Sequence, residues 1–235
     1  SAMHIHEGVT KNIAEELRRH LPFTLFGALS GIVLMFLFRG MSHEAAYDFF
    51  YVFHPLHVLL SALVTASLYR LHTCPRGGGR MCNLPWLFFI GFTGSIGVAT
   101  VSDSLMPYLG EALLNMPYRH EHIGFVEKGW LISGMAVVGI IIAFFNPSTK
   151  FPHAGHVLIS TWASLFHIMM ARGAGMTWGA YAAVFVFLFL AVWVPCCFSD
   201  IVFPMLFVRE TRPAPGGHAG PGTQKRAHAH RGNNG

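Results

Sequence analysis

Residues 51–69 read YVFHPLHVLLSALVTASLY and carry no Asp, Glu, Lys or Arg. A bilayer with a hydrocarbon core of about 30 Å requires about 20 helical residues, so this stretch, begun at Asp48, is long enough to cross it. Lipid offers the backbone no hydrogen-bond partners, and each spanning segment is therefore expected to be a helix. The stretch predicts a membrane-spanning helix that holds two histidines, His54 and His57.

The rest of the chain repeats this apolar pattern. Hydrophobic residues make up 53% of the 235 residues and charged residues 11%, whereas soluble domains usually contain about 25% charged residues. The predicted spans are Leu21–Phe38, Asp48–Tyr69, Leu84–Val101, Gly129–Phe145, His156–Met170 and Trp178–Phe198. We therefore expect an all-α polytopic membrane protein, a bundle of about six transmembrane helices whose partner is the lipid bilayer.

Polar segments flank the predicted bundle, which occupies residues 21–208. Residues 1–20 include Asn12–His20 (NIAEELRRH), where apolar and charged residues alternate at helical spacing, as in an interfacial amphipathic helix. Residues 209–235 form a basic tail rich in Gly, Pro and His, and this composition predicts disorder.

The distribution of positive charge predicts the orientation. Twelve of the sixteen Lys and Arg residues lie in the segments on the side of the two termini. Cytoplasmic segments carry this excess, so both termini are expected in the cytoplasm, in a prokaryotic inner or plasma membrane. The same rule accounts for the net charge of +5 without a nucleic-acid partner. The sequence leaves a homo-oligomer open.

Histidines recur at helical spacing inside the spans. His54 and His57 lie three residues apart on one helical face, as do His153 and His156. His167 follows His156 by eleven residues, a spacing that brings two side chains within about 20° of one direction. Ionisable groups within a membrane are costly and usually mark function.

These histidines and two aspartates predict metal ligands in two clusters, one at each membrane face. The outer cluster would combine His54, His57, Asp103 and His167, with His120 and His122 in a nearby external loop. The inner cluster would combine His153, His156 and Asp200, with Cys196 and Cys197 nearby. Serine and threonine hydroxyls would connect the two clusters. Imidazole and carboxylate ligands suit a divalent transition metal such as zinc, iron or manganese.

The pattern favours a transporter or channel for a divalent transition-metal ion, because polar groups run from one face to the other. One alternative is an intramembrane metalloenzyme for a lipid or envelope substrate, with zinc or iron in the outer cluster and Glu111, Glu121 or Glu127 as general base. Another is a b-type haem cytochrome with His54 or His57 and His167 as axial ligands. The sequence contains no phosphate loop, GxSxG or HExxH motif that would indicate a soluble enzyme.

Overall fold

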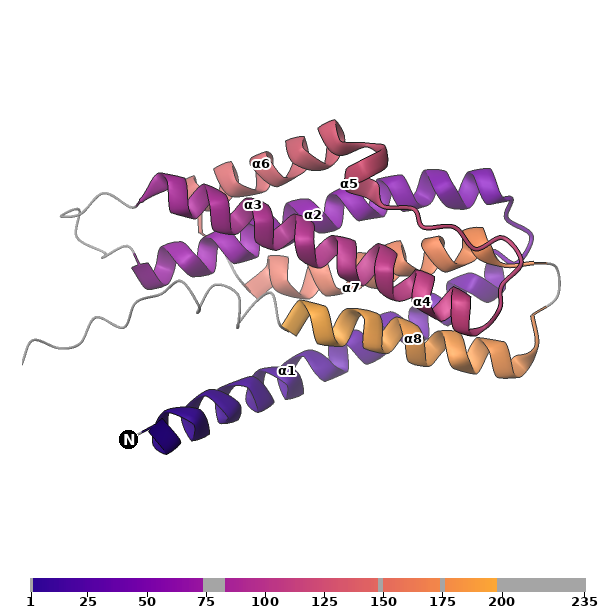
Figure 1. The fold of residues 1–235 in the computed structure, drawn as a ribbon, viewed down its shortest axis with the longest axis horizontal. Helices are drawn as coiled ribbons and strands as arrows, with labels where there is room; N and C mark the ends of the chain where they lie inside the picture. Colours follow the sequence, from indigo (N-terminus) through magenta and orange to yellow (C-terminus); the bar gives the residue numbers. More distant parts are fainter. Residues whose placement is uncertain (1, 74–82, 148–149, 174–175, 198–235) are drawn as a thin grey trace, which may run out of the picture.

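The computed structural model describes residues 2–73, 83–147, 150–173 and 176–197, and every regular element in these ranges is a helix. They are α1 (Ala2–Leu37), α2 (His43–Thr73), α3 (Leu84–Thr100), the π-helical turn η1 (Val101–Leu105), α4 (Met106–Leu113), α5 (Gly124–Glu127), α6 (Gly129–Phe145), α7 (Lys150–Ala171) and α8 (Trp178–Cys197). Figure 1 shows the long helices running side by side along one axis.

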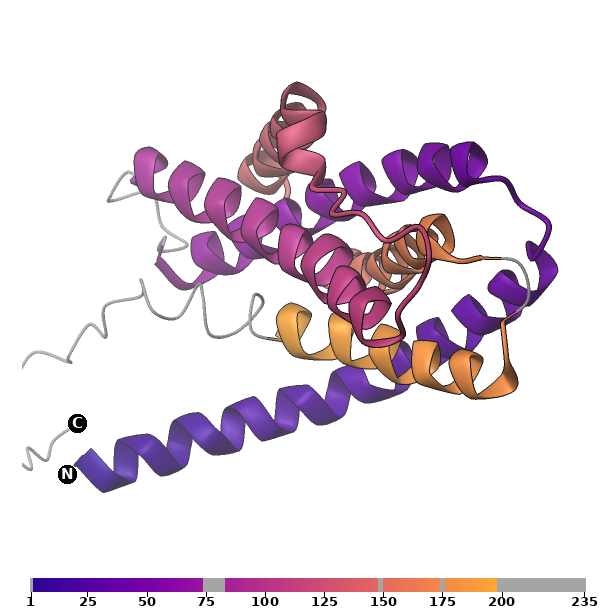
Figure 2. The same ribbon diagram turned by 45° about the vertical axis from the view of Figure 1, so that its right-hand side comes forward.

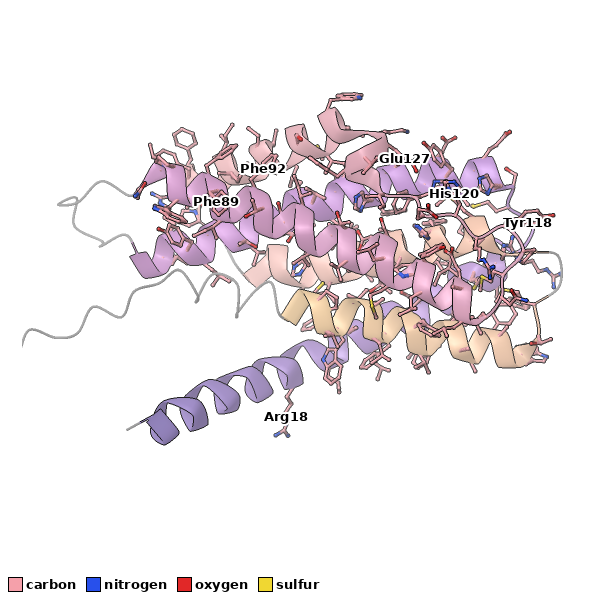
Figure 3. All side chains as sticks on the ribbon, viewed as in Figure 1. Arg18, Phe89, Phe92, Tyr118, His120 and Glu127 are labelled. Carbon is pink, nitrogen blue, oxygen red and sulfur yellow. The ribbon has the colours of Figure 1, made fainter. Side chains whose placement is uncertain are left out.

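The bundle has two ends, which we name after residues that lie there. At the Glu127 end, α1 passes into α2, α4 passes into α5, and α8 begins (Figure 1). At the Leu84 end, α2 finishes and α3 begins. Figure 3 shows His120, Glu127 and Tyr118 toward the first end and Phe89 toward the second.

Four helices in the described ranges are long and apolar enough to cross a membrane. They are His43–Leu71, Leu84–Leu113, Ala154–Ala171 and Trp178–Cys196. The two other predicted spans correspond to the shorter apolar helices Leu21–Leu37 and Gly129–Phe145. Seventeen helical residues reach only about 26 Å, so the total of six spans stays a prediction.

Helices α2 and α7 form the interior of the bundle and pack against each other over most of their length. Within the most apolar 18-residue stretch of each span, the buried share is 67% for α2 and 72% for α7. It is 39% for the span that includes α3 and 33% for α8. Interior helices can hold polar side chains away from lipid. His54 and His57 of α2 and His156 and His167 of α7 occupy this interior.

Three of the five tryptophans lie near the first residues of helices. Trp130 and Trp178 stand at the Glu127 end with 80% and 81% of their surface exposed, and Trp86 at the Leu84 end is 46% exposed. Tryptophan concentrates where lipid meets water. Their positions at the two ends suit a bundle that crosses a bilayer along its long axis.

Two expected boundaries differ in the structure. The predicted amphipathic segment and the first span form one continuous helix, α1, whose N-terminal half diverges from the other helices (Figures 1 and 2). The third predicted span does not stop at Val101, because η1 and α4 continue it to Leu113 for 30 residues. The predicted tail, 209–235, lies outside the described residues.

Close packing of α6 on α2 depends on Gly139. A Cβ atom there would lie 2.3 Å from the Leu59 carbonyl oxygen and 2.9 Å from the Ala62 Cβ. We expect Gly139→Ala to destabilise the protein by about 1–3 kcal/mol through overpacking, measured as a lower melting temperature in detergent. On the same helix Gly134 has no atom within 4 Å of such a Cβ, so Gly134→Ala should not lower it. Equal melting temperatures for the two variants would contradict this packing.

Candidate metal centre

Asp103 holds two histidines of α2. Its Oδ2 atom lies 3.0 Å from Nδ1 of His54 and 2.7 Å from Nδ1 of His57. Its Oδ1 atom accepts hydrogen bonds from the hydroxyls of Ser102, at 2.6 Å, and Ser160, at 2.8 Å. All five residues are at most 1% exposed. We call these five residues the Asp103 centre.

The local sequence explains how these residues meet. The i, i+3 spacing of His54 and His57 places both on one face of α2. Across from them, η1 has the wider turn of a π-helix, a rare form that is frequent at functional sites. In this turn the consecutive residues Ser102, Asp103 and Ser104 are all buried. The wider turn thus presents a short polar segment to α2 and α7.

The hydrogen bonds of Asp103 determine which imidazole nitrogens stay available. An ionised carboxylate only accepts hydrogen bonds, so Nδ1 of each histidine must donate. In a neutral imidazole the other nitrogen, Nε2, then carries a lone pair that can bind a metal. Nε2 of both His54 and His57 is buried without a hydrogen-bond partner. With four bonds accepted, Asp103 is better suited to orienting the imidazoles than to binding a metal itself.

Glu111 and His167 form a second pair of the same kind. The Glu111 Oε1 atom lies 2.7 Å from Nδ1 of His167, and both side chains are fully buried. His167 Nε2 has no hydrogen-bond partner. Glu111 lies beyond Val101, the predicted end of the third span, but it belongs to α4, which continues that span. The glutamate thus meets α7 inside the bundle.

A third pair lies at the Glu127 end, closer to solvent. Nδ1 of His122 lies 2.9 Å from Glu127 Oε1, and the hydroxyl of Tyr51 donates to Glu127 Oε2 at 2.7 Å. Burial lowers the pKa of His122 below its ordinary value, against the opposing effect of Glu127. Burial alone would raise the pKa of Glu127, but hydrogen bonds from Tyr51 and His122 outweigh it and lower that pKa. This pair therefore favours a neutral imidazole beside a carboxylate.

Ring contacts connect the three pairs. The ring centroids of His120 and His122 lie 4.9 Å apart, and those of His122 and His167 lie 5.8 Å apart. The Phe50 ring contacts His167 at 5.5 Å and stacks on His54 at 5.0 Å. The histidines thus follow one another from the Glu127 end toward the Asp103 centre, with Phe50 between His167 and His54.

His57 also faces a group from two further helices. Its ring stacks on that of His156 with centroids 5.7 Å apart. One potential ligand atom from each of His57, His156 and Cys196 lies within 4.8 Å of the other two. His120, His122 and Glu127 satisfy the same criterion at the Glu127 end.

The structure changes the predicted layout of two clusters. His54, His57 and Asp103 lie together as expected, but Asp103 lies beside the middle of α7 rather than at an end of the bundle, because its partner Ser160 is the eleventh of the 22 residues of that helix. His156, expected in a separate inner cluster, stacks on His57. His167 pairs with Glu111 rather than with Asp103.

The remaining predicted residues divide into two groups. His120 and His122 lie together in the segment between α4 and α5. The side chain of His153 and the whole of Asp200 lie outside the described residues.

The predicted hydroxyl path between the clusters is also revised. The Ser160 hydroxyl donates to Asp103, and the Ser164 hydroxyl donates to the backbone carbonyls of Ser102 and Ser160.

Sequence reasoning missed which histidines Glu111 and Cys196 meet. Glu111 was not expected to pair with His167, because the third span was predicted to end at Val101. Leu105, Leu109 and Leu113 nevertheless continue the apolar pattern at helical spacing. Cys196 was expected near the inner pair His153 and His156 but not beside His57, since nothing in the sequence specifies how α8 packs against α2. Comparison with family models, with curated proteins and with solved structures found no match to this chain.

Proposed function

We propose that the protein is a membrane transporter or channel for a divalent transition-metal ion, with both termini on the cytoplasmic side. The observation that carries the proposal is the repeated His–carboxylate pair. In the described residues, three carboxylates engage Nδ1 of four imidazoles. Metal-binding histidines in proteins are commonly oriented in this way, with Nε2 left for the metal.

The gradient of exposure supports a route for the ion. His120 is exposed, the His122 side chain is 13% exposed, and His167 is 1% exposed. Beyond Phe50 the route would reach the Asp103 centre. From there Ser61 and Thr65 continue along α2 toward the Leu84 end, and their buried hydroxyl oxygens have no hydrogen-bond partner.

Charge supports a cation as the cargo. Asp103 and Glu111 bring carboxylates into the interior of the bundle, where both are fully buried. Imidazoles in the same region add no positive charge when they are neutral. Ionisable groups that face the interior of a bundle typically mark ion pathways.

The positions of the glutamates favour transport over hydrolytic catalysis. A metalloenzyme needs a general base that faces a metal-bound water. Glu111 and Glu127 instead each engage the Nδ1 atom of a histidine. Glu121, the third glutamate considered for that role, is exposed. The haem alternative that pairs His54 with His167 is also weakened, because the Phe50 ring contacts both histidines and lies between them.

Zinc flux into liposomes tests the proposal. The full chain is reconstituted into liposomes that contain a zinc-sensitive dye, and Zn²⁺ is added outside. We expect dye-reported uptake, and we expect His167→Gln to slow it roughly tenfold, because an oriented imidazole on the route is lost. His43→Gln is the matched control, since His43 Nδ1 lies 3.0 Å from the Met170 carbonyl oxygen and engages no carboxylate.

Two results would contradict the proposal. Uptake no faster than in protein-free liposomes, from protein that binds zinc, would favour the metalloenzyme. Equal slowing by His167→Gln and His43→Gln would show that the His167–Glu111 pair has no specific part in the flux.

A further inference from the structure

Three side chains from three helices converge beside the Asp103 centre. His57 comes from α2, His156 from α7 and Cys196 from α8. One potential ligand atom from each lies within 4.8 Å of the other two, and all three residues are at most 1% exposed. We propose that these residues bind a thiophilic metal ion of the zinc class, Zn²⁺ or Cd²⁺, in preference to Mn²⁺. The inference rests on the proposed function, because it names the class of ion for that route.

The dimensions fit such a site after a small adjustment. Zn–N bonds of about 2.0 Å and Zn–S bonds of about 2.3 Å in a tetrahedron place donor atoms roughly 3.4 Å apart. Donor atoms within 4.8 Å of one another therefore need to approach by at most about 1.4 Å, which side-chain rotation can supply. Three protein ligands leave a fourth position open for water or for the next ligand on a route.

His57 is already oriented toward such a role. Asp103 holds its Nδ1 atom, and its Nε2 atom is buried without a hydrogen-bond partner. The His57 ring stacks on His156, so this free nitrogen belongs to the imidazole that adjoins the other two donors. A carboxylate–histidine–metal arrangement of this kind makes the imidazole a stronger ligand.

The thiol determines the class of ion. Thiolate and imidazole together favour zinc and related soft ions, whereas manganese prefers carboxylate, carbonyl and water oxygen. Binding would release the Cys196 thiol proton to solvent, because only the thiolate is a ligand. The thiolate and the Asp103 carboxylate then balance the two charges of Zn²⁺. Such pairing is required because Cys196 packs with Val157 and Val192 in a buried apolar cluster.

Cobalt spectroscopy tests the site directly. Co²⁺ is titrated into the purified, metal-free full chain in detergent, and the near-ultraviolet thiolate-to-cobalt charge-transfer band is recorded. We expect a band that saturates at one Co²⁺ per chain, that Zn²⁺ removes and that excess Mn²⁺ leaves unchanged. Cys196→Ser should abolish the band, since the sulfur is lost with little change in volume.

The other cysteines supply the controls. The double variant Cys74→Ser, Cys82→Ser and the single variant Cys197→Ser should each retain the band, because Cys196 is intact. Circular dichroism and gel filtration verify that Cys196→Ser is folded. A band that persists in folded Cys196→Ser, or that is lost with another cysteine, would overturn the proposal, as would the absence of a band in the wild-type protein.

Zinc uptake by the same preparation separates this inference from the proposed function. A band that depends on Cys196, without zinc flux, supports the site and contradicts transport. Zinc flux without a band contradicts the site and leaves transport supported. A Cys196-dependent band together with zinc flux that Cys196→Ser slows supports both the metal site and transport.

Discussion

Asp103→Asn is expected to lower the free energy of unfolding by about 3 kcal/mol and to weaken zinc binding roughly 10–100-fold. The carboxylate accepts four hydrogen bonds in a fully buried position. Asparagine keeps the shape but replaces one accepting oxygen with an NH₂ group, so two of the four donors would face another donor. Charged hydrogen bonds each contribute about 1.5–3 kcal/mol. The melting temperature in detergent and calorimetric zinc titration measure the two effects.

Ser104→Ala is the matched control for Asp103→Asn. Ser104 is the next residue in η1 and is equally buried, but its hydroxyl oxygen has no hydrogen-bond partner. Removal of an unsatisfied hydroxyl should leave stability unchanged or slightly raise it. If the two variants melted alike and bound zinc alike, Asp103 would not be the residue that organises this region.

The secondary structure could be predicted largely from apolar periodicity. The predicted span Asp48–Tyr69 lies within α2, and Gly129–Phe145 coincides with α6, because runs of that length without charge are helical in lipid. The predicted end of the third span, Val101, was wrong, because the helix continues through the buried Asp103 to Leu113. A buried aspartate in mid-helix depends on partners from other helices, and a single span does not reveal them.

The candidate site could be predicted by residue type but not by pairing. The i, i+3 spacing identified His54 and His57, since it depends only on helix geometry. The stacking of His57 on His156 depends on how far α7 is shifted along α2. The π-helical turn adds a further change of register that spacing rules for an α-helix do not include. Helix packing therefore decides which carboxylate meets which imidazole.

His57→Gln is expected to weaken zinc binding by more than the roughly 10–100-fold that loss of an orienting partner alone costs. Glutamine retains an amide that can donate to Asp103, but it has no imidazole nitrogen for the metal. His54→Gln is the matched control, because His54 makes the same hydrogen bond to Asp103. The His54 ring packs against Gly124, where an added Cβ would lie close to His54 Nε2. The Nε2 atom of His54 therefore has little room for an ion.

Calorimetric titration of Zn²⁺ into the wild-type protein and these two variants tests most directly whether a free, oriented imidazole in the interior of the bundle binds metal. We predict stoichiometric Zn²⁺ binding by the wild-type protein. The binding constant of His54→Gln should lie within about tenfold of the wild-type value. Folded His57→Gln should show no measurable binding at the interior site. Equal zinc affinity in all three proteins, or no zinc binding by the wild-type protein, would contradict the account.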